Sequence, residues 1–170
     1  MSDPLLPDWC RIDTALAVAK IQITGAADVP QRLASALGLS APAPNRFTSA
    51  GDLALAAIAP GEWLLTGGGE SVANALMHIR ECLGDATVLA LDLTHGRIVL
   101  RLEGPAGRDW LAAFTPLDLR PEHFPTGVAV RTRFADIGVF AARTGDTPAF
   151  LLIADQSYAG YLQHLLGSSS

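Results

Sequence analysis

The chain of 170 residues has a net charge of −5, and only 17% of its residues are charged while 49% are hydrophobic. This length fits one compact domain or two small modules packed as one body. The 12 lysines and arginines are spread along the chain, which argues against a nucleic-acid-binding surface. An average soluble protein has about 25% charged residues. The shortfall favours a surface that a partner covers, although abundant alanine would also raise the hydrophobic fraction.

The sequence favours a cytoplasmic location. No apolar run approaches the ~20 residues that a transmembrane helix needs, and the segment Met1–Pro4 lacks the positive and apolar regions of a signal peptide. The two cysteines, Cys10 and Cys82, form neither a disulfide framework nor a metal-binding pair. Cys82 lies in an apolar helical pattern, so we expect it to pack in the core.

Two successive halves show the same order of predicted elements: strand, helix, strand pair and helix. In the first half, apolar spacing and turn signals predict elements at 19–23, 28–37, 53–58, 62–66 and 70–83. In the second half, they predict elements at 98–102, 105–114, 128–134, 137–142, 149–154 and from about 156 onward. Asp28 is expected to act as the N-cap of the first helix.

The repeated order predicts an α+β fold of two tandem ferredoxin-like repeats, each a sheet with two helices on one face. The expected domains are 10–93 and 94–167, with residues 1–9 and 168–170 as tails. Strand 87–93 is expected to complete the first sheet and to turn into a hairpin that joins the two halves.

Patterns typical of metal sites and nucleophilic catalysis are weak. His78 and Cys82 are four residues apart on a predicted helix, but no third zinc ligand is evident. The chain has no Gly-x-Ser-x-Gly motif. Ser71 and Ser157 stand at helix starts, where capping explains them better than catalysis does.

Phosphate binding and acid–base catalysis are not supported either. Residues 67–71 precede a helix and resemble a phosphate cradle, but the Walker lysine is missing and Glu70 would repel a phosphate. The carboxylates that could form a catalytic pair are scattered along the chain, at Asp92, Glu103, Asp109, Asp118 and Asp136.

The segment 92–97 reads Asp-Leu-Thr-His-Gly-Arg and is the most polar cluster in the chain. Asp92, His95 and Arg97 near one turn could bind a polar ligand or a partner's carboxylate. An Asx-type turn with solvated charges is the alternative.

Four segments of the chain resemble the gamma subunit of heterotetrameric sarcosine oxidase. They are a Pro-x-Glu-Trp-Leu-Leu strand, an Asp-Leu-Ser-His-Gly-Arg-like hairpin, an Arg-x-x-Gly-Pro helix start and a proline-rich loop, found here at 60–65, 92–97, 101–105 and 116–125. The proline-rich loop is the most specific of them. One departure is that Phe114-Thr115 precedes the loop, where the family often has Gly-Cys.

The resemblance implies a fold akin to that of the folate-binding aminomethyltransferase, the T-protein of glycine cleavage. It also implies a noncatalytic subunit that stabilises a flavin-dependent oxidase complex, which demethylates sarcosine to glycine with tetrahydrofolate as one-carbon acceptor. FAD, FMN, NAD and tetrahydrofolate are expected in the larger alpha and beta subunits. No cofactor, metal or catalytic residue is expected in this chain, which is not expected to be catalytic alone.

Trp63, Trp110 and the proline-rich loop are candidate contacts with the larger subunits, although both tryptophans could equally lie in the core. Two other hypotheses remain open. One is a stand-alone folate-binding, aminomethyltransferase-like protein in which Asp92 would hold the pterin. The other is a ferredoxin-like module that forms a homodimer.

Overall fold

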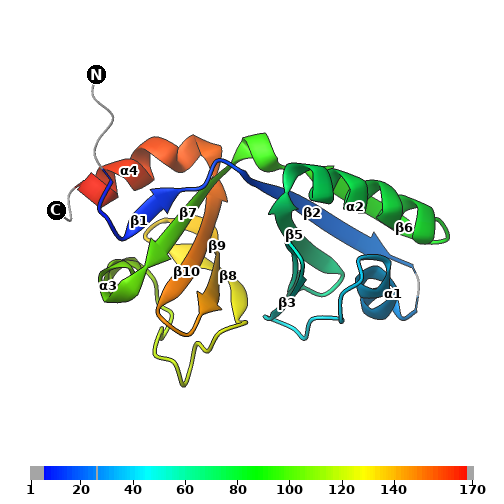
Figure 1. Cartoon of the computed structure of the whole chain (residues 1–170), viewed down its shortest axis with the longest axis horizontal. Helices are drawn as coiled ribbons and strands as arrows, with labels where there is room; N and C mark the ends of the chain where they lie inside the picture. Colours follow the sequence, from blue (N-terminus) through cyan, green and yellow to red (C-terminus); the bar gives the residue numbers. More distant parts are fainter. Residues whose placement is uncertain (1–5, 26, 168–170) are drawn as a thin grey trace. The chain divides into compact units, whose positions relative to one another are not determined.

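The computed structural model describes residues 6–25 and 27–167, which form two compact units (Figure 1). The central unit comprises Ala15–Thr94. The terminal unit combines the described residues up to Thr14 with those from His95 onward. None of the described helices is long and apolar enough to span a membrane.

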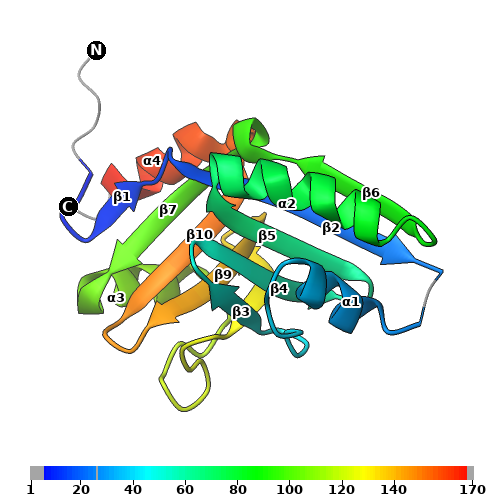
Figure 2. The same ribbon diagram turned by 45° about the vertical axis from the view of Figure 1, so that its right-hand side comes forward.

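The central unit is one antiparallel sheet with two helices. Its elements are β2 (Leu16–Thr24), α1 (Val29–Ala36), β3 (Phe47–Ala50), β4 (Leu53–Ala59), β5 (Glu62–Gly68), α2 (Gly69–Cys82) and β6 (Thr87–Asp92). The strand order is β3-β4-β5-β2-β6, so β6 lies at one edge. Helices α1 and α2 lie on the same face of the sheet (Figure 2).

Alternation along the strands explains which face of this sheet the helices cover. On β2, Ala19 and Ile21 point to the helix side and are fully buried. They pack in one cluster with Leu65 of β5 and Ile79 of α2. Their neighbours on β2, such as Lys20, point to the opposite face, as the two-residue period of a strand requires.

The terminal unit is a second five-stranded antiparallel sheet. Its elements are β1 (Cys10–Ile12), β7 (Arg97–Glu103), α3 (Gly104–Phe114), β8 (Ala129–Phe134), β9 (Ile137–Gly145), β10 (Ala149–Asp155), the short 3-10 helix η2 (Gln156–Tyr158) and α4 (Ala159–Gly167). The strand order is β1-β7-β10-β9-β8. Leu100 of β7, Leu152 of β10, Leu111 of α3 and Leu162 of α4 are buried in its core.

The predicted strands and helices are present, but the expected first domain, 10–93, is wrong at its beginning. Residues Cys10–Ile12 form β1, which pairs with β7 of the terminal unit, with Cys10 opposite Leu102 and Ile12 opposite Leu100. A strand of three residues is too short to show alternation, so the sequence carried no signal for it. The four-residue strand β3 was also missed, because its residues do not alternate between buried and exposed positions.

One local prediction is wrong, and another is confirmed in position only. Strands β6 and β7 form no hairpin, because β6 pairs with β2 while β7 pairs with β1 and β10. The 3-10 turn η1 (Thr94–Gly96) therefore connects two different sheets. Asp28 is at the N-cap position of α1, as expected, but its backbone is left-handed, with φ of 56°, and its side chain makes no capping hydrogen bond.

The segment before the central unit is tied to the terminal unit by an ion pair. Nε of Arg101, on β7, lies 2.6 Å from Oδ2 of Asp13, and the two side chains are 27% and 12% exposed. The backbone N–H of Asp13 also donates to the carbonyl of Val99 at 2.9 Å. Removing one partner leaves a poorly solvated charge, which costs more than losing an exposed pair.

We predict that Asp13→Asn lowers the free energy of unfolding by roughly 1–2 kcal/mol. Glu103→Gln is the matched control, because the Arg11–Glu103 pair is 3.8 Å long and its side chains are 61% and 63% exposed. It should change stability by less than ~0.5 kcal/mol. Urea unfolding followed by circular dichroism measures both variants, and equal losses would contradict the role given to Asp13.

Candidate functional site

Polar side chains of the segment 92–97 form hydrogen bonds with backbone groups on both sides of η1. Asp92 Oδ1 accepts hydrogen bonds from the N–H of Thr94 at 2.9 Å and from its hydroxyl at 2.6 Å. The Thr94 hydroxyl oxygen accepts in turn from the N–H of Val18 at 3.1 Å. Asp92 therefore forms an Asx-type turn, the alternative that the sequence left open.

Arg97 and His95 follow this turn and belong to the terminal unit. Nη1 of Arg97 donates to the carbonyl of Gly96 at 2.9 Å and to Asp155 Oδ2 at 3.0 Å. The N–H and hydroxyl of Ser157, with Arg97, lower the pKa of Asp155. His95 is exposed at the turn. Asp92 and Arg97 thus each stabilise the turn within their own unit, and both Asp92 and His95 are exposed to solvent.

A carboxylate of the chain itself, that of Asp52, binds the glycine-rich segment before α2. Oδ2 of Asp52, from the turn between β3 and β4, accepts from the N–H of Gly68 at 3.0 Å. The Ser71 hydroxyl and this N–H lower the pKa of Asp52. A Cβ atom on Gly67 would lie 2.8 Å from the backbone carbonyl oxygen of Asp52, so that position requires glycine, whereas a Cβ atom on Gly68 would lie 2.6 Å from Oδ2 and would displace the Asp52 carboxylate.

The segment that resembled a phosphate cradle in the sequence therefore binds Asp52 of the same chain. A carboxylate at a helix N-terminus takes the place that an anion would occupy. Ser71 donates to Asp52, and the 3-10 helix η2 is capped by Asp155 rather than by Ser157. Asp52 was missed in the sequence because its partners lie 16 residues or more further along the chain.

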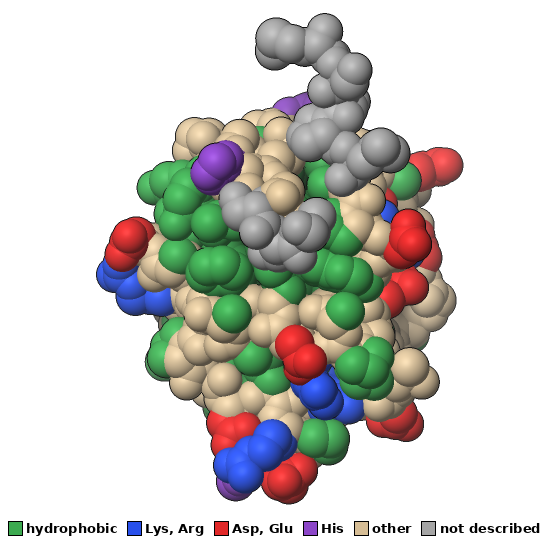
Figure 3. Space-filling model, turned by 90° about the vertical axis from the view of Figure 1, so that its left-hand side faces the viewer, with side chains coloured by type: hydrophobic (Ala, Val, Ile, Leu, Met, Phe, Trp, Pro, Cys, Tyr) green, Lys and Arg blue, Asp and Glu red, His purple; other side chains and the backbone are tan. Residues whose placement is uncertain are grey.

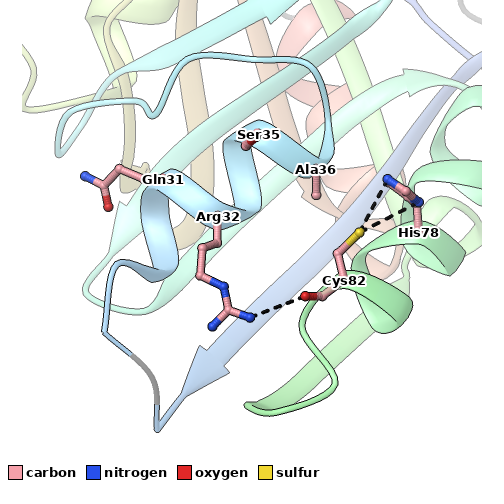
Figure 4. A pocket seen from close by; sticks show the side chains of 6 residues that line it. All are labelled: Gln31, Arg32, Ser35, Ala36, His78 and Cys82. Atoms are coloured by element: carbon pink, nitrogen blue, oxygen red, sulfur yellow. Dashed lines mark hydrogen bonds between the residues drawn. The ribbon is translucent and has the colours of Figure 1, made fainter.

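A shallow depression of about 530 Å³ lies between α1 and α2 (Figure 4). Its lining residues are Gln31, Arg32, Ser35, Ala36, His78 and Cys82. Cys82 is exposed, so the prediction that it packs in the core is wrong. Its Sγ lies 3.5 Å from Nε2 of His78.

Neighbouring groups limit the chemistry of this depression, and the other cysteine, Cys10, lies outside it, in the core of the terminal unit. Burial raises the pKa of the Cys10 thiol to about 11, so that thiol stays protonated at neutral pH. Arg32 is paired with Asp85 at 2.6 Å and donates to the carbonyl of Cys82 at 3.3 Å. Within 6–25 and 27–167, no three His, Cys, Asp or Glu side chains come close enough to hold a metal ion.

Arg143, on β9, is a buried charge that the sequence analysis missed. The residue is only 3% exposed. Its guanidinium donates to three backbone carbonyls, those of Phe124 and Gly145 at 3.1 Å and of Asp146 at 3.0 Å. The guanidinium also lies 5.8 Å from the ring centroid of Phe150. An arginine at the end of the apolar run 137–142 was the available signal.

These bonds anchor the proline-rich loop between α3 and β8. The N–H of Arg143 donates to the Val128 carbonyl, and its carbonyl accepts from Gly127, both at 3.0 Å. The loop buries Leu119 and Phe124 beneath it. Its backbone is therefore held at one end by a buried cation and along its length by apolar side chains.

Charged side chains on the outer side of this loop pair with one another. The guanidinium of Arg120 donates to both carboxylate oxygens of Asp118 and lowers its pKa. His123 Nε2 lies 3.8 Å from the same carboxylate. This side of the loop, with Glu122, is exposed and presents both signs of charge.

Both tryptophans proposed as partner contacts lie in the core, since Trp63 is 3% and Trp110 is 5% exposed. Trp110 packs against three aromatic rings, those of Trp9, Phe114 and Phe134. Its Nε1 is the buried side-chain polar atom without a hydrogen-bond partner in the described part of the chain. Neither tryptophan can touch a partner without disturbing these cores.

The large apolar side chains that are exposed lie elsewhere. They are Met77 on α2, Leu89 and Leu91 on β6, and Tyr158 and Tyr161 at the start of the C-terminal helical region. Hydrophobic side chains also gather on the side of the molecule shown in Figure 3, with charged side chains mostly around its margin.

Comparison with known proteins places these features in a family. The model of the sarcosine oxidase, gamma subunit family matches residues 23–170. A curated relative, the sarcosine oxidase subunit gamma of Corynebacterium sp. (strain U-96), is 34% identical over 137 residues, which are 79% of this chain. That match covers 65% of the relative, so this chain spans just under two thirds of its length.

Solved structures show the same fold. A chain of the heterotetrameric sarcosine oxidase from Corynebacterium sp. U-96, in complex with pyrrole 2-carboxylate, matches with a TM-score of 0.83 and 25% identity. The match covers 99% of this chain and 85% of that one. The glycine cleavage system aminomethyltransferase T from Bartonella henselae matches with a TM-score of 0.69 and 15% identity, over 92% of this chain and 44% of that one.

We predict that Asp52→Ala lowers the midpoint of thermal unfolding at pH 7, because it removes the acceptor for Gly68 and Ser71. The pKa of Asp52 is depressed in the folded state, so its contribution is present above the unfolded-state value of about 3.9. It is lost as the pH falls through the folded-state pKa. The gap between wild type and variant should therefore narrow below about pH 4.

Asp136→Ala is the control for this pH series, since the Asp136 side chain is 97% exposed. In calorimetry, we expect its midpoint of thermal unfolding to equal that of wild type at pH 7 and at pH 3. A constant gap for Asp52→Ala between pH 7 and pH 3 would contradict the ionic role of this carboxylate.

We predict that Arg143→Met lowers the free energy of unfolding by about 3 kcal/mol, because it leaves three carbonyls without their donor. It should also speed cleavage by a glutamate-specific protease after Glu122, an exposed residue of the loop. Arg133→Met, at a side chain that is 69% exposed, should stay within ~0.5 kcal/mol of wild type. A variant at position 143 as stable and as protease-resistant as wild type would show that the loop is held by other contacts.

Proposed function

Because this chain belongs to the sarcosine oxidase, gamma subunit family, we propose that it is a noncatalytic subunit of a flavin-dependent sarcosine oxidase complex. Its role is to stabilise the larger alpha and beta subunits. The complex would convert sarcosine to glycine with oxygen and tetrahydrofolate, in the cytoplasm. FAD, FMN, NAD and tetrahydrofolate would bind to those larger subunits, and this chain would hold none of them.

The observation that carries the proposal is the match to a chain of a heterotetrameric sarcosine oxidase over 99% of this chain. The state of the polar residues supports it. Asp52, Asp92, Arg97 and Arg143 each bond to backbone groups of turns, loops or a helix start. Side chains committed in this way hold the fold together rather than converge on a substrate.

The stand-alone folate-binding alternative is not favoured. It required Asp92 to hold the pterin, yet the Asp92 carboxylate already accepts two hydrogen bonds from Thr94. Likeness to the aminomethyltransferase at 15% identity concerns the fold alone.

The topology supports two ferredoxin-like repeats as the finer description of the fold. In the central unit, β2, β4, β5 and β6 take the spatial order β4-β5-β2-β6, with helices after the first and third of them. The terminal unit has the corresponding order β9-β10-β7-β1, in which β1 fills the place of the fourth strand. The second repeat would then be completed by a strand that precedes it in the chain.

The start of the C-terminal helical region is our candidate for a contact with a larger subunit. Helix α4 contains no Asp, Glu, Lys or Arg, and it buries Leu162 and Leu166 against its own unit. Tyr158 and Tyr161 are nevertheless 41% and 39% exposed. Tyrosine is enriched in interface centres, where its ring is buried and its hydroxyl finds a partner. His95, together with Asp92 and Arg97, is proposed as a further contact.

We predict that the chain co-purifies as a yellow complex when it is expressed with the alpha and beta subunits of the oxidase. The chain expressed alone should be colourless and should give no binding heat with micromolar tetrahydrofolate. Tyr161→Lys should reduce recovery of the complex by about tenfold or more, because it places a charge at the interface. Asn74→Lys on the exposed face of α2 is the control.

These experiments test the subunit role and the tyrosine contact separately. If the wild-type chain fails to bind either larger subunit, the proposed function is wrong. If both variants assemble like wild type, the subunit role stands and the tyrosine contact is wrong. Tetrahydrofolate binding to the isolated chain would instead favour the stand-alone alternative.

A further inference from the structure

Strand β6 is an open sheet edge with exposed leucines. It lies at the end of the order β3-β4-β5-β2-β6, and among the described residues it pairs on one side only, with β2. Leu89 and Leu91 are 44% and 43% exposed. They stand opposite Gln22 and Lys20, on the face of the sheet away from α2. An open edge of this kind is a template for pairing with another strand.

The register shows which backbone groups of β6 point outward. The N–H of Leu93 donates to the carbonyl of Val18, so Leu93 directs its backbone groups toward β2. In an antiparallel pair this direction alternates from residue to residue. Leu89 and Leu91 therefore also bond inward, while Val88 and Ala90 direct their N–H and C=O groups away from the sheet.

One of these outward groups is occupied by a side chain. Nη2 of Arg80, on α2, donates to the carbonyl of Ala90 at 2.6 Å. This bond places a guanidinium on the middle of the edge. A strand that tried to pair with β6 would have to displace it and would lose a charge-assisted hydrogen bond.

The sequence of β6 is complementary to itself about Ala90. In an antiparallel pair of two β6 strands centred on Ala90, Leu89 would face Leu91 of the second copy, and Val88 would face Asp92. No like charges would be opposed, and two leucine pairs would form on one face. Each Ala90 carbonyl would then accept a hydrogen bond from the N–H of Ala90 in the second copy, and this is the carbonyl to which Arg80 now donates.

We propose that Arg80 guards the edge of the central sheet against pairing with β6 of a second copy of this chain. A second copy of β6 is the strand that would pair here, because the sequence of β6 is complementary to itself. A contact limited to six residues of one edge buries far less than the ~1,200 Å² of a stable interface. Pairing through β6 is therefore weak, and one blocked carbonyl is enough to prevent it.

Substitution of Arg80 in the full chain tests the proposal. Arg80→Met keeps the apolar stem and a residue that favours helices, but it removes the guanidinium. We expect its dissociation constant for self-association to be about tenfold lower than that of wild type. Sedimentation velocity at matched concentrations measures this, against a monomer mass of 17.8 kDa.

Leu89→Lys in the Arg80→Met background makes the readout specific for β6, since it breaks both leucine pairs and should restore wild-type behaviour. Arg108→Met is the control, because Arg108 bonds only to the neighbouring Asp109 among the contacts resolved for it and lies on a helix. Arg80→Gln, which is too short to reach Ala90, is a second test.

The result decides the proposal in every case. Self-association of Arg80→Met that Leu89→Lys reverses supports it. Self-association equal to wild type, or unaffected by Leu89→Lys, overturns it. If circular dichroism shows that neither Arg80→Met nor Arg80→Gln folds, Arg80 is required for the fold and is not a guard of the edge.

Discussion

The pairing of β1 with β7 is the constraint on which the organisation of the chain depends. It places Cys10 opposite Leu102 and ties Cys10–Ile12 to a sheet whose other strands begin at Arg97. The central unit, Ala15–Thr94, is thereby enclosed in sequence between two parts of the terminal unit. The terminal sheet is complete only after the central unit has been synthesised, because its edge strand and its central strands lie on either side of that unit in the chain.

Polar side chains in this protein mainly satisfy the backbone where regular structure stops. Asp52 binds the start of α2, Asp92 closes the turn after β6, and Asp155 caps η2. Arg143 does the same for a loop, with three carbonyls in place of a carboxylate. Backbone groups at the ends of helices and strands need partners, and here three exposed carboxylates and one buried guanidinium provide them.

This use of polar residues is consistent with membership of a family of subunits in a larger oxidase. The exposed apolar side chains fall into two groups, one at a helix and the other on a sheet edge. Tyr158 and Tyr161 adjoin a helix without charged side chains, which favours a covered surface. Leu89 and Leu91 lie on an edge whose central carbonyl is held by Arg80. We infer that the first surface is used for assembly and that the second is kept from pairing.

The sequence alone determined the types and order of the main elements, because the period of apolar residues reports which side of each strand or helix is buried. It also determined the family, through short motifs such as the proline-rich loop at 116–125. The tertiary structure alone decided which strands pair, so β1 joined the terminal unit and the expected hairpin at 92–97 became a connection between sheets. It also decided that Trp63 and Trp110 are buried, that Cys82 is exposed and that Asp52 fills the helix start. The reason is that periodicity records the environment of a residue, whereas strand partners and hydrogen-bond acceptors distant in sequence arise only when the whole chain is folded.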